Sequence, residues 1–275
     1  ALTPEAAAHL GFPAGVEVVA GAGDGQCAGL GAGVVDERRA YLNLGTAVVC
    51  GVLSDQLYTD LAFRTLVAPK AGHNVLETDL QGGTFTLTWL AETLLGGGEA
   101  ERPSLEASAA ELAPGADGLL LVPYLAGVMN PYWDDQATGL LAGLRGHHGP
   151  AHLYRAVLEG IALELRFHLR AVVAARGEVD EVVVMGGGSR SELWCQLVAD
   201  VLELPVRRAS SADATALGAG MLAAVGAGWF DDVTEASAMA GAAGEAFRPR
   251  PSVVPFYRRL FEEVYCGLYE AVAER

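Results

Sequence analysis

The clearest signal for the fold is the stretch Glu181-Val182-Val183-Val184-Met185-Gly186-Gly187-Gly188-Ser189-Arg190-Ser191. Four of its first five residues are apolar, which predicts a buried strand over 181–185. A glycine turn follows the strand, and the next residues predict a helix from Glu192 to about Leu202. A further strand is predicted from Pro205. A strand, a glycine turn and a helix in this order indicate an α/β domain whose ligands bind at the strand ends.

Two more glycine turns follow predicted strands near the beginning of the chain. The β-branched segment Val16–Ala20 predicts a strand that runs into Gly21–Gln26, with a helix from Cys27 to about Val34. This places Asp24 at the tip of a strand. Residues 40–44 and 47–53 predict two strands, and the Gly45-Thr46 pair between them predicts a tight hairpin turn or a close backbone approach.

Apolar periodicity predicts the remaining elements. The pattern favours one long amphipathic helix over 151–176 and a closely packing alanine-glycine helix over 214–226. The other expected elements are a short helical piece within 1–15, a helix over 87–95, a strand over 119–122 and a final helix over 253–273.

Composition narrows the classes of function. The chain has 275 residues, 51% of them apolar, and 18 Lys plus Arg against 34 Asp plus Glu give a net charge of −16. Such an acidic surface repels nucleic acids and anionic membranes, so we expect small-molecule ligands. No apolar run is long enough to span a membrane, and we expect a cytoplasmic protein. Lys70 has no glycine loop before it, which excludes a phosphate loop of the Gly-Lys-Ser/Thr type.

Metal and disulfide sites are not expected. No two of the four cysteines (Cys27, Cys50, Cys195 and Cys266) form a Cys-x-x-Cys pair, so buried free thiols are the better interpretation. His148 and His152 have helical metal-binding spacing, but Gly149-Pro150 between them places His148 outside the helix.

The three glycine turns suggest phosphate binding, because glycine lets backbone N–H groups approach phosphate oxygens. Tight turns without a ligand would use the same residues. A dinucleotide-binding pattern is broken at the third glycine, which is Gln26 in one turn and Ser191 in another. Asp24, flanked by glycines, is a candidate general base for phosphoryl transfer, or alternatively a cap of the following helix.

Taken together, these motifs resemble the FGGY family of carbohydrate kinases, and xylulokinase-like members most. The likeness extends over nearly the whole chain. Gly139–Leu144 followed by His152–Glu159 is similar to the family's C-terminal signature. Gly186–Gln196 resembles its adenosine motif, and Asn43–Thr46 resembles its second phosphate motif.

The resemblance implies an actin-like, ribonuclease-H-like α/β fold that binds ATP and Mg²⁺ and a sugar in the cleft between two domains. It implies that Asp24 is the general base and Gln26 a nearby sugar ligand. The implied nucleotide contacts are Gly45 and Thr46 at the phosphates, Gly83 close by, and Gly187, Gly188 and Ser191 at the adenosine.

Family members are about twice this length and begin with a further domain that carries an Asp-x-Gly-Thr motif. The resemblance therefore implies that residues 1–275 form the C-terminal domain, inactive without its N-terminal partner. We expect a sugar or polyol substrate, with a ketopentose such as xylulose as the leading candidate and a homodimer as an assembly to test. The alternatives are a non-catalytic actin-like nucleotide-binding module and a Rossmann-type oxidoreductase.

Several positions depart from the family pattern and bear on the substrate. Gly25 stands between Asp24 and Gln26, where the family has Asp-Gln in succession. The other departures are Ala47, Val128, Met129 and Thr138.

Overall fold

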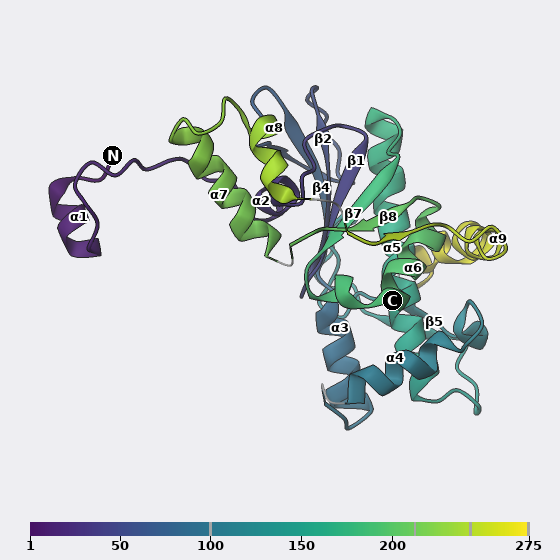
Figure 1. Ribbon diagram of the computed structural model, residues 1–275. Helices are drawn as coiled ribbons and strands as arrows, with labels where there is room; N and C mark the ends of the chain where they lie inside the picture. Colours follow the sequence, from purple (N-terminus) through teal and green to yellow (C-terminus); the bar gives the residue numbers. More distant parts are fainter. Residues whose placement is uncertain (99–100, 212, 242–243, 274–275) are drawn as a thin grey trace.

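The computed structural model describes residues 1–98, 101–211, 213–241 and 244–273. Its centre is a mixed seven-stranded sheet in the order β3-β4-β2-β1-β7-β8-β9 (Figure 1). The strands are β1 Arg39–Leu44, β2 Val48–Ser54, β3 Arg64–Val67, β4 Asn74–Leu80, β7 Glu181–Met185, β8 Val206–Arg208 and β9 Ala246–Phe247. A separate two-stranded sheet pairs β5 Leu120–Val122 with β6 Leu140–Ala142.

The strand register brings the glycine turns to one edge of the sheet. β1 and β7 run parallel, with Asn43 opposite Met185, so their carboxyl ends lie side by side. β1 and β2 form an antiparallel hairpin with Leu44 opposite Val48, which confirms the predicted turn at Gly45-Thr46. The turns after β1 and β7 therefore meet at this edge, which is where open α/β sheets bind ligands.

Helices cover both faces of the sheet. α2 (Asp24–Gly31) and α7 (Ala214–Gly226) pack on one face, and α5 (Pro150–Arg176) and α6 (Glu192–Leu202) pack on the other (Figure 1). The remaining helices are α1 Pro4–Leu10, α3 Thr84–Trp89, η1 Leu90–Leu94, α4 Arg102–Ala110, η3 Ala116–Gly118, η4 Gly187–Arg190, α8 Val233–Ala236, η5 Ser237–Ala240, α9 Val254–Arg259, η6 Leu260–Val264, η7 Tyr265–Gly267 and α10 Leu268–Ala273.

Strand alternation gives each face its own core. Tyr41 and Val183 point toward α2, whereas Leu42 and Val184 point toward the α5 side. All four side chains are buried, as expected for central strands covered on both faces. The α/β class predicted from the sequence is confirmed.

α2 and α7 approach each other closely enough to require glycine. A Cβ atom at Gly31 would lie 1.8 Å from the Ala214 carbonyl oxygen, and one at Gly218 would lie 1.9 Å from that of Cys27. Neither distance is possible for real atoms, and both neighbours are rigid backbone. The predicted close packing of the alanine-glycine helix is confirmed, and its partner is α2.

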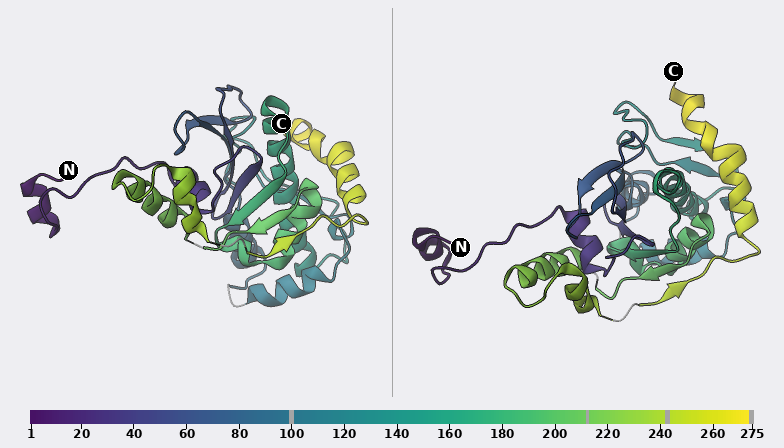
Figure 2. Two further views of the ribbon diagram at one scale, coloured as in Figure 1. Left: turned by 45° about the horizontal axis from the view of Figure 1, so that its top comes forward. Right: turned by 90° about the horizontal axis from the view of Figure 1, so that it is seen from above.

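The predicted strand over Val16–Ala20 is wrong. These residues form an extended arm that leads away from the body to α1 (Figures 1 and 2). Val18 is 67% exposed, and no strand within the described ranges pairs with the arm, so β-propensity alone does not make a strand there. Asp24 consequently does not follow a strand. It is the first residue of α2, which begins three residues earlier than predicted.

The final predicted helix is not continuous. Its residues form α9, η6, η7 and α10 in succession. Val264 leaves helical geometry at φ −124° and ψ −62°, just before Tyr265, whose hydroxyl donates to Glu164 Oε2 at 2.6 Å. Anchoring Tyr265 in the core changes the helical register.

Across the described ranges, no helix is both long and apolar enough to cross a membrane.

Candidate functional site

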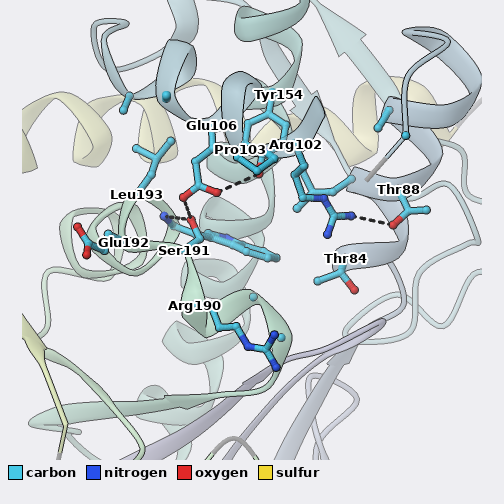
Figure 3. Close-up of a pocket in the computed structure, with 18 of the residues that line it drawn as sticks. Thr84, Thr88, Arg102, Pro103, Glu106, Tyr154, Arg190, Ser191, Glu192 and Leu193 are labelled. Atoms are coloured by element: carbon cyan, nitrogen blue, oxygen red, sulfur yellow. Dashed lines mark hydrogen bonds between the residues drawn. The ribbon is translucent and has the colours of Figure 1, made fainter. Parts of the chain in front are cut away.

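A cavity of about 980 Å³ opens beside the glycine turn that follows β7 (Figure 3). Its walls come from α3, η1 and α4 on one side and from η4 and the start of α6 on the other. Gly187, Gly188 and Ser191, which the resemblance implies are adenosine contacts, all line it. The volume lies in the range of small-molecule and cofactor pockets.

The turn that borders the cavity is held in a fixed shape. A Cβ atom at Gly188 would lie 2.5 Å from the Trp194 ring, so this position requires glycine. The Ser189 hydroxyl donates to the Gly186 carbonyl at 2.7 Å, and Arg208 Nε donates to the Ser189 carbonyl at 2.7 Å. The backbone of the turn is thereby preorganised.

Ser191 connects the turn to α4. It is the N-cap of α6, and its hydroxyl oxygen accepts from the Trp194 backbone N–H at 2.9 Å. The same hydroxyl donates to Glu106 Oε1 at 2.6 Å, and Tyr154 donates to Glu106 Oε2 at 3.5 Å. Sequence reasoning missed Glu106, because nothing in the α4 sequence distinguishes it from a solvent-exposed acidic residue.

The hairpin turn at Gly45-Thr46 lies next to the cavity. The Thr84 N–H donates to the Gly45 carbonyl at 2.8 Å, and Thr84 itself lines the cavity. A Cβ atom at Gly83 would lie 2.5 Å from the same carbonyl oxygen, so Gly83 packs directly on the turn. Gly45, Thr46 and Gly83 are outside the lining but border it, and Thr46 is exposed.

Asp24 is exposed at the start of α2, on the other face of the sheet from α6. Gly23 is the N-cap, so Asp24 does not cap the helix in that position. Its Oδ1 accepts from the Gly25 N–H at 2.8 Å. Asp24 does not line the cavity.

A buried carboxylate, Glu77 of β4, fixes the first turn of α2. Glu77 is 3% exposed and accepts hydrogen bonds from Gln26 Nε2 at 3.0 Å, the Tyr41 hydroxyl at 2.6 Å and Arg64 Nη2 at 2.7 Å. Burial raises the pKa of Glu77, and the bonds from Tyr41 and Arg64 oppose that rise. Gln26 is itself buried, and its amide nitrogen faces Glu77.

Asp79 extends this network toward Asp24. Arg64 Nη2 also donates to Asp79 Oδ2 at 3.3 Å, and the Asp79 N–H donates to Asn130 Oδ1 at 3.0 Å. Burial raises the pKa of Asp79, Arg64 opposes the rise, and the negative charge of Asp24 adds to it.

Sequence reasoning also missed Glu77, Asp79 and Arg64. A signal was present, because Glu77 and Asp79 are two residues apart in a strand and so share one face with Val75. A carboxylate on an apolar face of a central strand indicates a built polar site.

The side chains of His148 and His152 accept hydrogen bonds from backbone N–H groups. His148 and His152 accept at Nδ1 from the N–H groups of Arg145 (3.0 Å) and Gly149 (3.1 Å). α5 begins at Pro150, so His148 lies outside the helix as predicted. No set of three or more metal-ligating side chains is present within the residues the structure describes.

Residues 35–227 match the model of the FGGY family of carbohydrate kinases, C-terminal domain. The chain belongs to this family. Xylulose kinase of Staphylococcus epidermidis is 32% identical over 279 residues, covering 98% of this chain and 54% of that protein. Glycerol kinase of a Geobacter species is 35% identical over 267 residues, covering 94% and 52%. The chain thus spans about half the length of these FGGY relatives.

Solved FGGY structures share the fold. The crystal structure of xylulose kinase from Rhodospirillum rubrum matches all of this chain and 55% of its own, with a TM-score of 0.89 at 32% identity. Ligand-bound xylulose kinase from Lactobacillus acidophilus matches 98% of this chain and 55% of its own, with a TM-score of 0.90 at 25% identity. The fold is the actin-like, ribonuclease-H-like α/β fold expected from the resemblance.

Proposed function

We propose that this FGGY domain takes part in ATP-dependent phosphorylation of a sugar hydroxyl. The observation that carries the proposal is the arrangement at one sheet edge. There, the Gly45-Thr46 turn packs on the α3 N-terminus, which lines a nucleotide-sized cavity, and the Gly187-Gly188 turn forms another wall. Backbone N–H groups in such turns suit phosphate oxygens.

Asp24 is the proposed general base. As the sugar oxygen attacks the γ-phosphorus of ATP, the new oxygen–phosphorus bond forms and the bond to the ADP oxygen breaks. The hydroxyl proton passes to the Asp24 carboxylate. An exposed carboxylate on a fixed helix start is suited to this role, and the Gln26–Glu77 bond holds that helix start against the sheet.

The proposed nucleotide contacts follow the order of these elements. Gly187, Gly188 and Ser191 line the adenosine cavity, and Gly45, Thr46 and Gly83 lie where the phosphates would leave it toward Asp24. The Ser191 hydroxyl is engaged with Glu106, so its proposed role is to shape the wall together with Glu106. Mg²⁺ would be held chiefly by the phosphates, because Mg²⁺ binds through substrate phosphates and one or two carboxylates.

The proposed substrate is a ketopentose such as xylulose. The support is that several relatives are xylulose kinases, although others are a glycerol kinase and a gluconokinase. Gln26 was expected to bind the sugar. Its amide nitrogen is bonded to Glu77, so we propose that Gln26 positions Asp24. The departures at Ala47, Val128, Met129 and Thr138 bear on the choice of substrate.

We further propose that catalysis needs the N-terminal half that the FGGY relatives have. Phosphoryl transfer depends on holding the sugar, the phosphates and Mg²⁺ in line. Asp24 is exposed and outside the cavity, so this domain provides one wall of the reacting site. The isolated domain is expected to bind ATP and to release almost no ADP. We also propose that the protein is cytoplasmic. Whether it forms a homodimer can be tested by measuring its mass in solution.

The test is a coupled ADP-release assay on the domain joined to the N-terminal half that the proposal requires, with ketopentoses, polyols, gluconate and glycerol as candidate substrates. One substrate should stimulate ADP release, and Asp24→Asn should abolish the stimulation while ATP binding persists. Asp117→Asn, at another exposed aspartate, is the matched control. ATP binding without stimulation by any substrate would instead favour a non-catalytic nucleotide-binding module. NAD binding in place of ATP would favour an oxidoreductase.

A further inference from the structure

Arg190 is a cation on the wall of the cavity. It is the last residue of η4, it is exposed, and it lines the cavity together with Gly187 and Gly188. A Cβ atom at Gly187 would have no neighbour within 4 Å, so the space above the turn is open. Figure 3 shows Arg190 and Glu106 on opposite sides of Ser191.

The turn that ends at Arg190 packs on the strand that leads into the hairpin turn. Gly186 and Gly188 pack on the end of β1, where Cβ atoms would lie 3.0 Å from the Leu44 carbonyl oxygen and 2.9 Å from the Leu44 Cβ. Leu44 is followed directly by Gly45-Thr46. The turn that ends at Arg190 therefore adjoins both the cavity and the end of β1 that leads into the hairpin turn.

Five charged residues line the cavity, namely Glu92, Arg102, Glu106, Arg190 and Glu192. Arg102 donates to Thr88 at 3.0 Å, and Glu106 accepts from Ser191. The Arg190 guanidinium has no hydrogen-bond or ion-pair partner in the part of the chain that the structure describes. A chain with a net charge of −16 repels anions at long range, so a local cation is needed to attract one.

We propose that Arg190 is a phosphate ligand of the nucleotide and gives the cavity its orientation. It would bind phosphate oxygens at the hairpin end, so the uncharged nucleoside would lie toward Glu106. The planar guanidinium suits phosphate oxygens, because it can donate two parallel hydrogen bonds. This inference rests on the proposed nucleotide site and deepens it, by assigning the contact that distinguishes nucleotides from nucleosides.

The experiment compares the binding of Mg·ATP, ADP and adenosine to the 275-residue chain by isothermal titration calorimetry. Arg190→Gln should weaken ATP and ADP binding roughly 10-fold to 100-fold, as expected for a lost charge-assisted hydrogen bond, and should leave adenosine binding unchanged. Arg190→Lys should recover part of the loss. The matched control is Arg259→Gln, which removes one exposed cation on α9, away from the cavity.

The outcomes separate this inference from the proposed function. Equal ATP affinity in the wild type and Arg190→Gln would overturn the inference and leave the nucleotide site standing. An equal loss for adenosine and ATP would also overturn it, because a phosphate ligand cannot act on a nucleoside. If the wild type binds neither ATP nor adenosine, the nucleotide site itself is wrong. Circular dichroism melting checks that each variant folds. The melting temperature of Arg190→Gln should stay close to that of the wild type, because Arg190 makes no hydrogen bond or ion pair with the described residues.

Discussion

The Glu77 carboxylate occupies the space that a side chain at position 25 would need. A Cβ atom on Gly25 would lie 2.4 Å from Glu77 Oε2. Gly25 is in the first turn of α2, directly after the proposed base Asp24, and Glu77 projects from β4. The residue beside Asp24 is therefore fixed by a strand more than 50 positions away in the sequence.

This relationship predicts strong coupling between the two positions. Gly25→Ala should lower the free energy of unfolding by about 1–3 kcal/mol through overpacking. Glu77→Ala should lower it by a similar or larger amount, since Gln26, Tyr41 and Arg64 lose their shared acceptor. In the double variant, Gly25→Ala should cost much less, because the methyl group enters the space that Glu77 leaves. Urea unfolding of the four proteins measures this coupling, and simple additivity would contradict it.

A second prediction concerns a buried ion pair on α5. Arg155 Nε donates to Glu159 Oε1 at 2.6 Å, and Tyr257 donates to the same oxygen at 2.7 Å. Glu159→Ala should cost about 3–5 kcal/mol of stability, because it leaves the buried Arg155 charge unpaired.

The matched control for that pair is the exposed ion pair between Arg38 and Asp180. Asp180→Ala should cost at most about 1 kcal/mol, since exposed pairs contribute little. Both costs come from chemical denaturation midpoints at neutral pH. Equal costs for Glu159→Ala and Asp180→Ala would contradict the expectation that breaking a buried ion pair costs more stability than breaking an exposed one.

Glu203 predicts a pH dependence of stability. Hydrogen bonds from Arg258 and Arg166 lower the pKa of Glu203 from its usual 4.5. Because the folded-state pKa is depressed, the stabilisation is present above pH 4.5 and is lost as the pH falls through the folded value. Glu203→Gln should cost about 0.5–1 kcal/mol at pH 7, and the cost should become progressively smaller as the pH falls below 4.5. Glu111→Gln, an exposed control, should show no such trend. A Glu203 effect that grows toward acid pH would reverse the assigned sign.

Thiol labelling provides a fourth prediction. Burial raises the pKa of Cys50 to about 12 and that of Cys195 to about 11, and Cys27 is also buried. Cys266 is partly exposed. Iodoacetamide at pH 8 should therefore modify the native chain at Cys266, because the thiolate is the reacting form and needs access. Mass spectrometry should find no rapid labelling of native Cys266→Ser, whereas urea should expose the other thiols. Rapid native labelling of Cys50 would contradict the buried core.

Local sequence patterns were sufficient to predict those helices whose own residues mark where they begin and end. α6 and α7 have the predicted bounds, because amphipathic or small-residue periodicity and flanking turn residues mark their ends. The same reasoning failed at Val16–Ala20, because none of the strands in the described part of the chain lies beside these β-branched residues. It also failed at the final helix, where the contact between Tyr265 and Glu164 breaks the register.

Short-range residue order was enough to predict the α/β class, the family and the hairpin turn at Gly45-Thr46, because each of these has a local pattern. Only the tertiary structure decided which side chains meet. Glu77 reaches Gln26, Glu106 reaches Ser191, and Arg190 lies beside the cavity with no partner among the described residues. These relationships join residues far apart in the chain. They depend on strand register and helix packing, which fix positions to within ångströms and which no local pattern contains.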